Sequence, residues 1–477
     1  MAMISCRSIF RSVKARNRTN QQYRSIQFEK PELLSGFSIS VNHPAASPFP
    51  FSDARISPRR QIILGALLLL FTAMMIPGLH GQVYDLGWWK MWSIHDWRYG
   101  LKDAYYQSNT DYLPLYHYVL WGFGCFVGSE QAIGHYIGYI RVFTLLADYW
   151  AIWIVYRWID CRQEYIFLLM CSMLNIGFSY NTIIWGQVDG IFTAFTLAAF
   201  YYQFKGRHVL SAAMLVLALN AKLQAVVFVP LWGILLIAGL HRGGQWRRLL
   251  YIVPAMLGME ALILLPFAFG HLGLGVLPKI ISGSVDAYPI LSVNASNWWF
   301  WFVPDANNFS DTARTPFGPT YKQIGLWSFF IASFIILFPP LRHMLLTLSG
   351  KVKDAFPREK IWVSAALISL AFFFFNTQMH ERYVHPAMIF ITAYAFYRRS
   401  HGVYVIFSLA YFLNLERVLQ WLDYPSYGIL FFMPEFIAAL FAVTITWLII
   451  QLYRPANATG SGEISPGEDI ARLQTNA

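Results

Sequence analysis

The sequence has few charged residues for its length. Only 13% of its 477 residues are Asp, Glu, Lys or Arg, whereas about a quarter of the residues are charged in soluble globular domains. Apolar residues make up 56% of the chain. This composition excludes an ordinary soluble domain and predicts an integral membrane protein.

Cysteine is also scarce, and the four cysteines form no CxxC pair. They are Cys6, Cys125, Cys161 and Cys171. With this spacing, neither a disulfide framework nor a cysteine metal site is indicated. A clear internal repeat is lacking too, which counts against a secondary carrier, because many carriers are built from inverted or parallel repeats.

Long apolar runs dominate the rest of the chain, and a membrane-spanning helix needs about 20 such residues. We therefore expect an all-α integral membrane protein with about twelve transmembrane helices. The expected spans are 61–77, 136–156, 165–181, 191–204, 209–219, 226–240, 250–269, 325–341, 361–376, 384–397, 403–421 and 428–453.

The basic residues set the expected orientation, because cytoplasmic loops retain Lys and Arg. If the apolar stretch 113–127 lies at the interface without crossing, 26 of the 36 Lys and Arg fall on the cytoplasmic side. A crossing by this stretch would put most of them outside. We therefore expect both termini in the cytoplasm, and the net charge of +11 then needs no nucleic-acid partner.

Three regions follow from these patterns. Residues 1–60 are basic and predict a disordered cytoplasmic tail, with a transit peptide or a mis-called start as alternatives. Residues 61–453 form the membrane domain. Residues 454–477 are polar and predict a disordered C-terminal tail.

Polar clusters recur where the predicted spans meet the outer side. A large outer loop follows the first span, is expected to carry amphipathic helices, and places Asp85, Asp96, Asp103 and Asp111 among aromatic residues. Later clusters read WGQVDG at 185–190, NAKLQ at 220–224, YPILSVNASNWW at 288–299 and QMHERY at 378–383. Ionisable groups beside apolar helices are costly without a partner or a function, so these clusters suggest one shared site.

These motifs, in this order, resemble the GT-C superfamily of multi-pass glycosyltransferases. An early Asp after the first span, DYLPLY at 111–116, WGQVD, SVNASNWW and MHERY carry the resemblance, which is nearest to bacterial proteins similar to GPI mannosyltransferases. DYLP departs from the commoner DYPP. The resemblance implies a polyprenyl-phosphate sugar donor, a glycan, lipid or protein acceptor, and inverting transfer of mannose or a similar hexose on the periplasmic or lumenal side, most simply of a bacterial inner membrane.

Asp85 matches the catalytic acid of this superfamily. A carboxylate is ionised at neutral pH and can take the proton of an acceptor hydroxyl. Asp111 is a second catalytic candidate, or it is the N-cap of a helix that begins near Pro114. His95 and Asp96 are interpreted as loop surface.

The remaining candidates would bind substrate. Lys222 and Arg382 are expected to contact phosphate; the alternatives are snorkelling of Lys222 to the interface and an Arg382–Glu381 pair that locks two helices. Asp189 could instead cap a helix, and Trp298 could be an interfacial anchor. Arg141 and Asp148 are expected to be structural buried charges. The full set of expected substrate contacts is Trp185, Gln187, Asp189, Lys222, Gln224, Asn294, Asn297, Trp298, His380, Glu381, Arg382 and Tyr383.

No metal or other cofactor is predicted, because His380 has no second His or Cys at ligand spacing. Mg²⁺ or Mn²⁺ stays open, since some relatives of this architecture use a divalent ion. Two other functions remain as alternatives: a transporter or flippase of lipid-linked sugar, and a polysaccharide polymerase or ligase. The first would show charges at mid-span and repeat symmetry; the second resembles enzymes with long outer loops but without MHERY.

Overall fold

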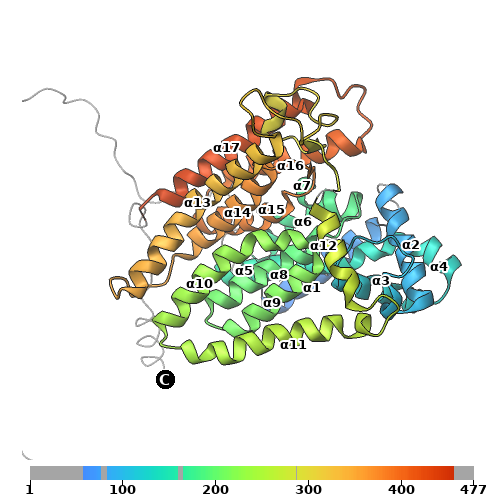
Figure 1. The fold of residues 1–477 in the computed structure, drawn as a ribbon, viewed down its shortest axis with the longest axis horizontal. Coiled ribbons are helices and arrows are strands. Elements are labelled where there is room, and N and C mark those ends of the chain that lie inside the picture. Colours follow the sequence, from blue (N-terminus) through green and yellow to red (C-terminus); the bar gives the residue numbers. More distant parts are fainter. Residues whose placement is uncertain (1–56, 77–82, 160–164, 286, 456–477) are drawn as a thin grey trace, which may run out of the picture. The chain divides into compact units, whose positions relative to one another are not determined.

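The computed structural model describes residues 57–76, 83–159, 165–285 and 287–455 (Figure 1). The two predicted tails, 1–60 and 454–477, lie almost entirely outside these residues. Within the described residues the chain is helical apart from loops and one short pair of strands. Cys6 and Cys161 also lie outside them, and Cys125 and Cys171 are free thiols.

The helices of the first half are α1 (Pro58–Met75), α2 (Val83–Tyr99), α3 (Pro114–Val127), α4 (Glu130–Tyr136), α5 (Arg141–Ile159), α6 (Tyr165–Met173), α7 (Ile176–Ser179), α8 (Asp189–Phe204) and α9 (His208–Ala221). The helices of the second half are α10 (Val229–Arg242), α11 (Leu249–Ala268), α12 (Leu277–Val285), α13 (Tyr321–Leu348), α14 (Arg358–Phe375), α15 (His385–Arg398), α16 (His401–Leu419) and α17 (Pro434–Tyr453). The strands are β1 (Ser292–Val293) and β2 (Met379–His380).

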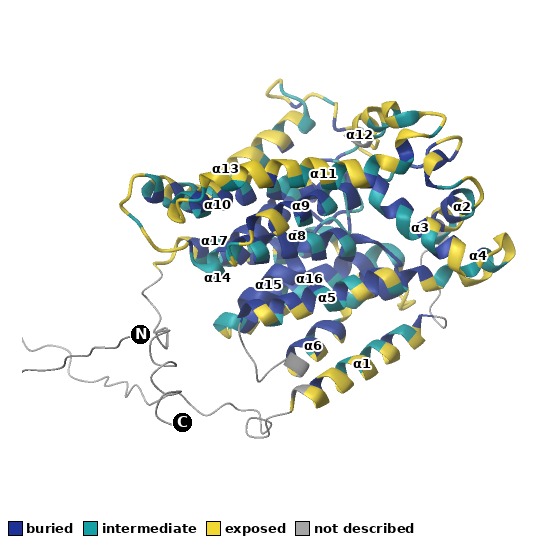
Figure 2. Cartoon of the chain, turned by 90° about the horizontal axis from the view of Figure 1, so that it is seen from below, coloured by how far each residue is buried: buried dark blue, intermediate teal, exposed yellow. Residues whose placement is uncertain are grey.

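Two of the helices, α8 and α15, form the centre of the bundle. Nearly all their residues are buried, whereas α1, α11 and α13 carry long rows of exposed apolar side chains (Figure 2). α8 packs on α5 and α9, and α15 packs on α14 and α16. Lipid would therefore meet the outer helices, while the central helices meet only protein.

Six helices of the described residues are long and apolar enough to cross a membrane, or seven if the bent pair 167–173 and 176–184 is one span. The predicted number was about twelve. α8, α9 and α15 account for part of the difference, because they have only 16, 14 and 14 residues. At about 1.5 Å per residue they are shorter than the hydrocarbon core of a bilayer. α3 is not among the candidate spans and packs mainly on α2.

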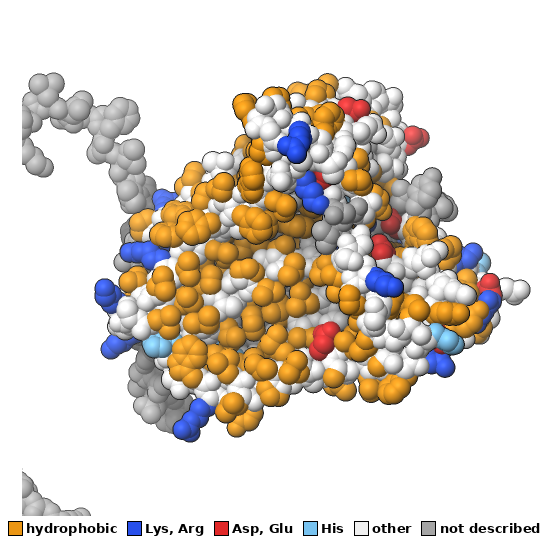
Figure 3. All heavy atoms as spheres, viewed as in Figure 1, with side chains coloured by type: hydrophobic (Ala, Val, Ile, Leu, Met, Phe, Trp, Pro, Cys, Tyr) orange, Lys and Arg blue, Asp and Glu red, His pale blue; other side chains and the backbone are white. Residues whose placement is uncertain are grey.

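Charge is distributed unevenly over the membrane-facing surface. Figure 3 shows a broad apolar face over α10, α11 and α13, with basic side chains at both of its ends, while the acidic side chains in this view lie away from the end where α13 stops and α11 begins. The turns at that end carry Arg242, Arg247, Arg248, Lys351 and Lys353. This is the end that the sequence assigns to the cytoplasm.

The polar motifs meet at the opposite end, near α2 and α3. There β1 and β2 pair in parallel, with Ser292 opposite Met379 and Val293 opposite His380. This short ladder joins the loop after α12 to the segment before α15. Residues almost 90 positions apart in the sequence are thereby fixed beside each other.

Candidate active site

The Trp185–Gly190 turn is the centre of the site. A short π-helical segment, η3 (Tyr180–Ile184), precedes it, and such segments are frequent at functional sites. Gly186 has a φ of 80°, a conformation that favours glycine. The indole of Trp89 on α2 donates to the Gly186 carbonyl at 3.1 Å. The turn is thus fixed against the first outer loop.

Asp85 lies in the first turn of α2 and is oriented by this turn. The indole Nε1 of Trp185 donates to Asp85 Oδ2 at 2.9 Å. Trp185 is itself 3% exposed, whereas Asp85 is half-buried. Trp185 was predicted to contact substrate; in the structure its polar group holds the predicted base. This bond holds the Asp85 carboxylate beside the Trp185–Gly190 turn.

Two charged side chains of α5 pack against the Trp185–Gly190 turn. Arg141 and Asp148 are both 2% exposed, as expected for structural buried charges. A Cβ added to Gly186 would lie 2.9 Å from Arg141 Nε, and one added to Gly190 would lie 2.2 Å from Asp148 Oδ1. Both glycines are therefore needed for this close packing. Asp148 also accepts a hydrogen bond from Thr182 at 2.6 Å.

Lys222 at the end of α9 forms an ion pair with Asp189 at the start of α8. The Lys222 ammonium also lies 4.7 Å from the centre of the Tyr383 ring, and Gln224 donates to the Tyr383 carbonyl at 2.5 Å. Lys222 therefore meets an anion, and the snorkelling alternative is wrong. Asp189 makes no side-chain cap of α8, because that helix has no side-chain cap hydrogen bond.

Arg382 joins this cluster from the loop before α15. Its Nη1 donates to Glu381 Oε1 at 2.8 Å, and its Nε lies 3.9 Å from Asp189 Oδ2. Burial alone would lower the pKa of Arg382, but Glu381 and Asp85 raise it well above its ordinary value. Arg382 and Glu381 are neighbours in one loop, so their pair does not lock two helices.

The same charges and the same burial also shift the pKa values of His380 and Glu381. Burial, together with the charges of Arg382 and Lys222, lowers the pKa of His380 well below its ordinary value. The imidazole is therefore neutral at neutral pH. Burial raises the pKa of Glu381, although Arg382 opposes this effect. The cationic part of the site is thus Lys222 and Arg382.

The long loop between α12 and α13 holds the Arg382 segment in place. Asp311 is fully buried, and its Oδ2 accepts hydrogen bonds from Thr377 and Gln378, both at 2.8 Å. Gln378 and Asn294, which flank the β1–β2 pair, have φ values of 63° and 65°. Such conformations are uncommon outside glycine and gather at functional sites.

Three predicted sugar contacts serve this loop instead. Asn297 is fully buried, and its amide donates to the carbonyls of Phe373 and Asn376. Trp298 donates to the Phe375 carbonyl at 3.1 Å. The Asn294 side chain accepts from Asn307 at 3.0 Å. These hydrogen bonds position the three residues within the loop, and their contact with sugar stays a prediction.

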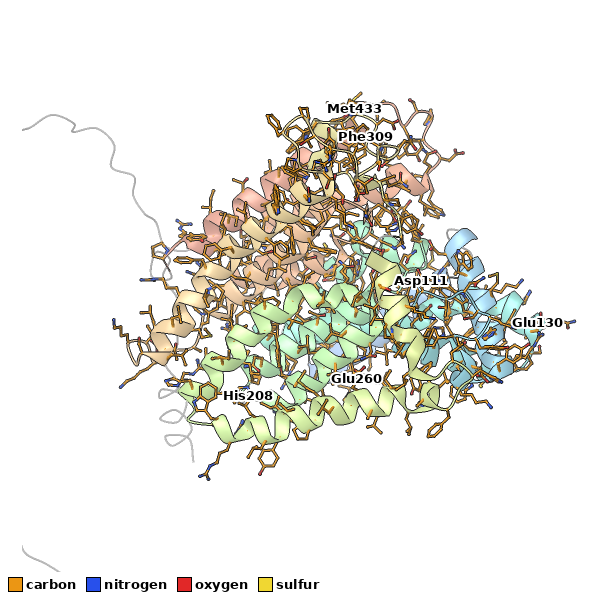
Figure 4. All side chains as sticks on the ribbon, viewed as in Figure 1. Asp111, Glu130, His208, Glu260, Phe309 and Met433 are labelled. Atoms are coloured by element: carbon orange, nitrogen blue, oxygen red, sulfur yellow. The ribbon has the colours of Figure 1, made fainter. Side chains whose placement is uncertain are left out.

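Asp111, labelled in Figure 4, is an exposed residue of the loop before α3. The N-cap of α3 is Leu113, and it has no side-chain cap hydrogen bond. The prediction that Asp111 caps this helix is therefore wrong. Burial raises the pKa of its carboxyl, and the charges of Arg382 and Lys222 oppose this effect.

Tyr112 is a residue that the sequence reasoning missed. Burial raises the pKa of its phenol well above the ordinary value, while the charges of Arg382, Asp189, Asp111 and Asp85 all act on it. The hydroxyl is therefore protonated at neutral pH, and the ring of Tyr112 packs on the rings of Trp89 and Trp92 of α2. The available signal was its place in the DYLPLY motif, where only the aspartate was considered.

The structure also corrects the interpretation of Asp96. It was interpreted as loop surface, but it is fully buried on the face of α2 that packs on α3. There it bonds His117 Nδ1 at 2.7 Å. His95 is only 15% exposed at its side chain and bonds the Tyr106 carbonyl at 2.8 Å.

Buried amides without protein partners line the inner side of the turn. Within the described part of the chain, neither side-chain atom of Gln187 makes a hydrogen bond, and the same holds for Asn181, although both residues are fully buried. Unpaired buried amides are costly and are usually met by water or a ligand. In the described residues no group of three or more His, Cys, Asp or Glu could hold a metal ion.

The arrangement supplies the two groups that are needed to transfer a sugar from one oxygen to another: a proton acceptor and a cation. Asp85 is an oriented, half-buried carboxylate and can accept a proton. Arg382 has one guanidinium nitrogen on Glu381 and a buried Nε that makes no hydrogen bond within the described residues, so it can receive an anion. Neither group alone is specific, but they lie in one cluster with Asp111, Tyr112 and Lys222.

A comparison with family models supports this chemistry. Residues 132–307 match the model of Glycosyltransferase family 87, which is a GT-C-type family of polytopic membrane glycosyltransferases. The match includes the Trp185–Gly190 turn and Lys222, and it excludes Asp85, Asp111 and Arg382. A search of curated proteins finds no match. The family match and the helices that are long and apolar enough to cross a membrane make the chain a membrane glycosyltransferase, similar over residues 132–307 to a family of the GT-C type.

Proposed function

We propose that the protein transfers a hexose, mannose or a similar sugar, from a polyprenyl-phosphate donor to an acceptor hydroxyl on the outer face of the membrane. The observation that supports this proposal best is the cluster formed by Asp85, Arg382 and Lys222 at the end of the bundle opposite the basic turns. It combines a proton acceptor with cations of the charge that a lipid phosphate requires.

In the proposed reaction the acceptor oxygen attacks the anomeric carbon and Asp85 takes its proton. The bond between that carbon and the phosphate oxygen breaks, and polyprenyl phosphate leaves with the electron pair. Attack opposite the leaving group inverts the anomeric centre. In many enzymes, fixed donors that meet the charge developing in the transition state contribute more to the rate than any other effect, and Arg382 would supply such donors here.

The two cations would have different parts in binding phosphate. Lys222 is already paired with Asp189, so a phosphate would compete with a buried carboxylate for it. Arg382 also pairs with Glu381 through Nη1, and its Nε lies 3.9 Å from Asp189 Oδ2, but it has five N–H donors and keeps several of them for a phosphate. We therefore assign the direct phosphate contact to Arg382, with Lys222 neutralising Asp189. Gln187, Gln224, His380, Glu381 and Tyr383 line the same cluster.

The donor class is tested with purified protein in liposomes. We expect hexose transfer from a polyprenyl-phosphate hexose and none from the matching nucleotide sugar, with a glycolipid extract of cells lacking the gene as acceptor. Mass spectrometry of that extract should show one hexose missing, restored by the wild type and not by Asp85→Asn. Transfer from the nucleotide sugar alone would refute the donor proposed here.

The proposed orientation is tested by reporter fusions. A reporter placed after Gly350, between α13 and α14, should be cytoplasmic, and one placed after Asn308 should be external. The reason is the excess of Lys and Arg in the turns at the Gly350 end. The opposite pair of results would put Asp85 and Arg382 on the cytoplasmic side and remove the outer-face reaction.

A further inference from the structure

A buried acid–imidazole pair lies behind the site, between α2 and α3. Asp96 and His117 are both fully buried, and His117 Nδ1 lies 2.7 Å from Asp96 Oδ2. The imidazole is enclosed by the rings of Tyr105 and Phe267, at centroid distances of 4.9 and 6.3 Å. A buried carboxylate is costly without a partner. The pair is therefore a built feature of the first outer loop, and the reaction proposed above does not use it.

The other imidazole nitrogen reaches the segment that enters the site. His117 Nε2 lies 3.3 Å from Thr110 Oγ1, and the same hydroxyl accepts the backbone N–H of Tyr112 at 3.3 Å. The phenol of Tyr105 donates to the Tyr112 carbonyl at 3.0 Å. These three bonds fix Thr110 and Tyr112 on either side of Asp111.

The fixed segment is otherwise an irregular loop. It begins after Asn109, whose φ is 52°, an uncommon conformation for a residue with a side chain. It ends at Pro114, where α3 starts. The Tyr112 ring packs on Trp89 and Trp92 of α2, while the contacts to His117 and Tyr105 hold the backbone on either side of Asp111. The ring of Tyr112 lies 5.0 Å from the ring of Trp89, whose indole donates to the Gly186 carbonyl of the central turn.

We propose that Asp96 and His117 are positioning residues that act through Thr110 to hold Asp111 and Tyr112 in the active site. Asp96 bonds Nδ1 and so fixes the ring and the nitrogen that faces Thr110, as the second hydrogen bond of a histidine usually does. The proposal rests on the proposed function only for its activity readout. Neither Asp96 nor His117 touches the reacting groups.

Thr110 gives the sharpest test, because it links the pair to the site without carrying charge. Thr110→Val keeps the shape and removes the hydroxyl, whereas Thr110→Ser keeps the hydroxyl. We expect Thr110→Val to lower kcat/KM about 10- to 100-fold, the effect of a small displacement of reacting groups, and Thr110→Ser to stay within about threefold of wild type. His117→Gln should resemble Thr110→Val.

A double-mutant cycle separates positioning from general stability. In an Asp111→Asn, Tyr112→Phe background, Thr110→Val should cost less than about twofold further, because the groups through which it acts are gone. A full additional loss in that background would overturn the proposal. Equal activity of the valine and serine variants in the wild-type background would overturn it as well.

A second measurement does not depend on the sugar donor. Amide hydrogen exchange of the peptide 106–113 should be roughly fivefold faster in Thr110→Val and His117→Gln than in Thr110→Ser, as expected for the loss of one hydrogen bond. Unchanged exchange would show that the pair does not hold the segment. If wild type fails to use any polyprenyl-phosphate hexose while exchange behaves as expected, the donor assignment fails and the positioning role stands.

Discussion

Asp85→Asn should abolish sugar transfer while leaving folding and donor binding nearly intact. The amide keeps the size of the side chain, and its carbonyl can still accept the hydrogen bond that Trp185 donates at 2.9 Å. What it loses is the ability to take a proton. The turnover number should fall at least by the roughly 10² to 10⁴ that a positioned base contributes, measured as hexose transfer in liposomes.

The matched control is Asp305→Asn, the same change at an exposed aspartate of the outer loop. It should transfer at the wild-type rate. Asp111→Asn provides the comparison within the site, because capping no longer explains Asp111. A nearly normal Asp85 variant with an inactive Asp111 variant would transfer the role of base to Asp111. Normal transfer by both would exclude the proposed mechanism.

Hydropathy predicts the lipid-facing helices better than the central ones. α11, α13 and α17 face outward, and their apolar stretches are long enough to appear as spans. α8 and α15 are enclosed by other helices, so they need neither full bilayer length nor a lipid-facing stripe. Hydropathy over a sequence window cannot separate a lipid-facing helix from a helix enclosed by protein, because both consist of apolar residues.

The sequence predicts the residues of the site better than it predicts their partners. The sequence indicates that Lys222 must meet an anion, since an ammonium beside apolar helix is costly, but not that the anion is Asp189. That pairing depends on how α8 and α9 pack. Asp96 was assigned to the surface because aspartate is usually exposed; its partner His117 is 21 residues away on another helix. Tertiary partners of this kind leave no local pattern.

Arg382→Ala should reduce kcat/KM for the polyprenyl-phosphate donor by about 10² to 10³, the usual effect of removing one fixed transition-state donor. Arg382→Lys should retain part of the activity, because it keeps the charge but loses the planar fork that bonds two phosphate oxygens. Both variants are assayed over a range of donor concentrations. A larger effect of Ala than of Lys on donor use would indicate direct contact with the anion.

Stability has to be separated from donor binding in this experiment. Arg382→Ala leaves Glu381 without its 2.8 Å partner in a buried position, and breaking such a pair can cost about 3–5 kcal/mol. The double variant Arg382→Ala, Glu381→Gln removes the unpaired charge and should recover thermal stability without recovering donor use. Arg417→Ala, which removes a guanidinium lying over the Phe300 ring, should leave donor use unchanged. If the double variant also recovers transfer, Arg382 has only a structural role and the phosphate contact must be sought at Lys222.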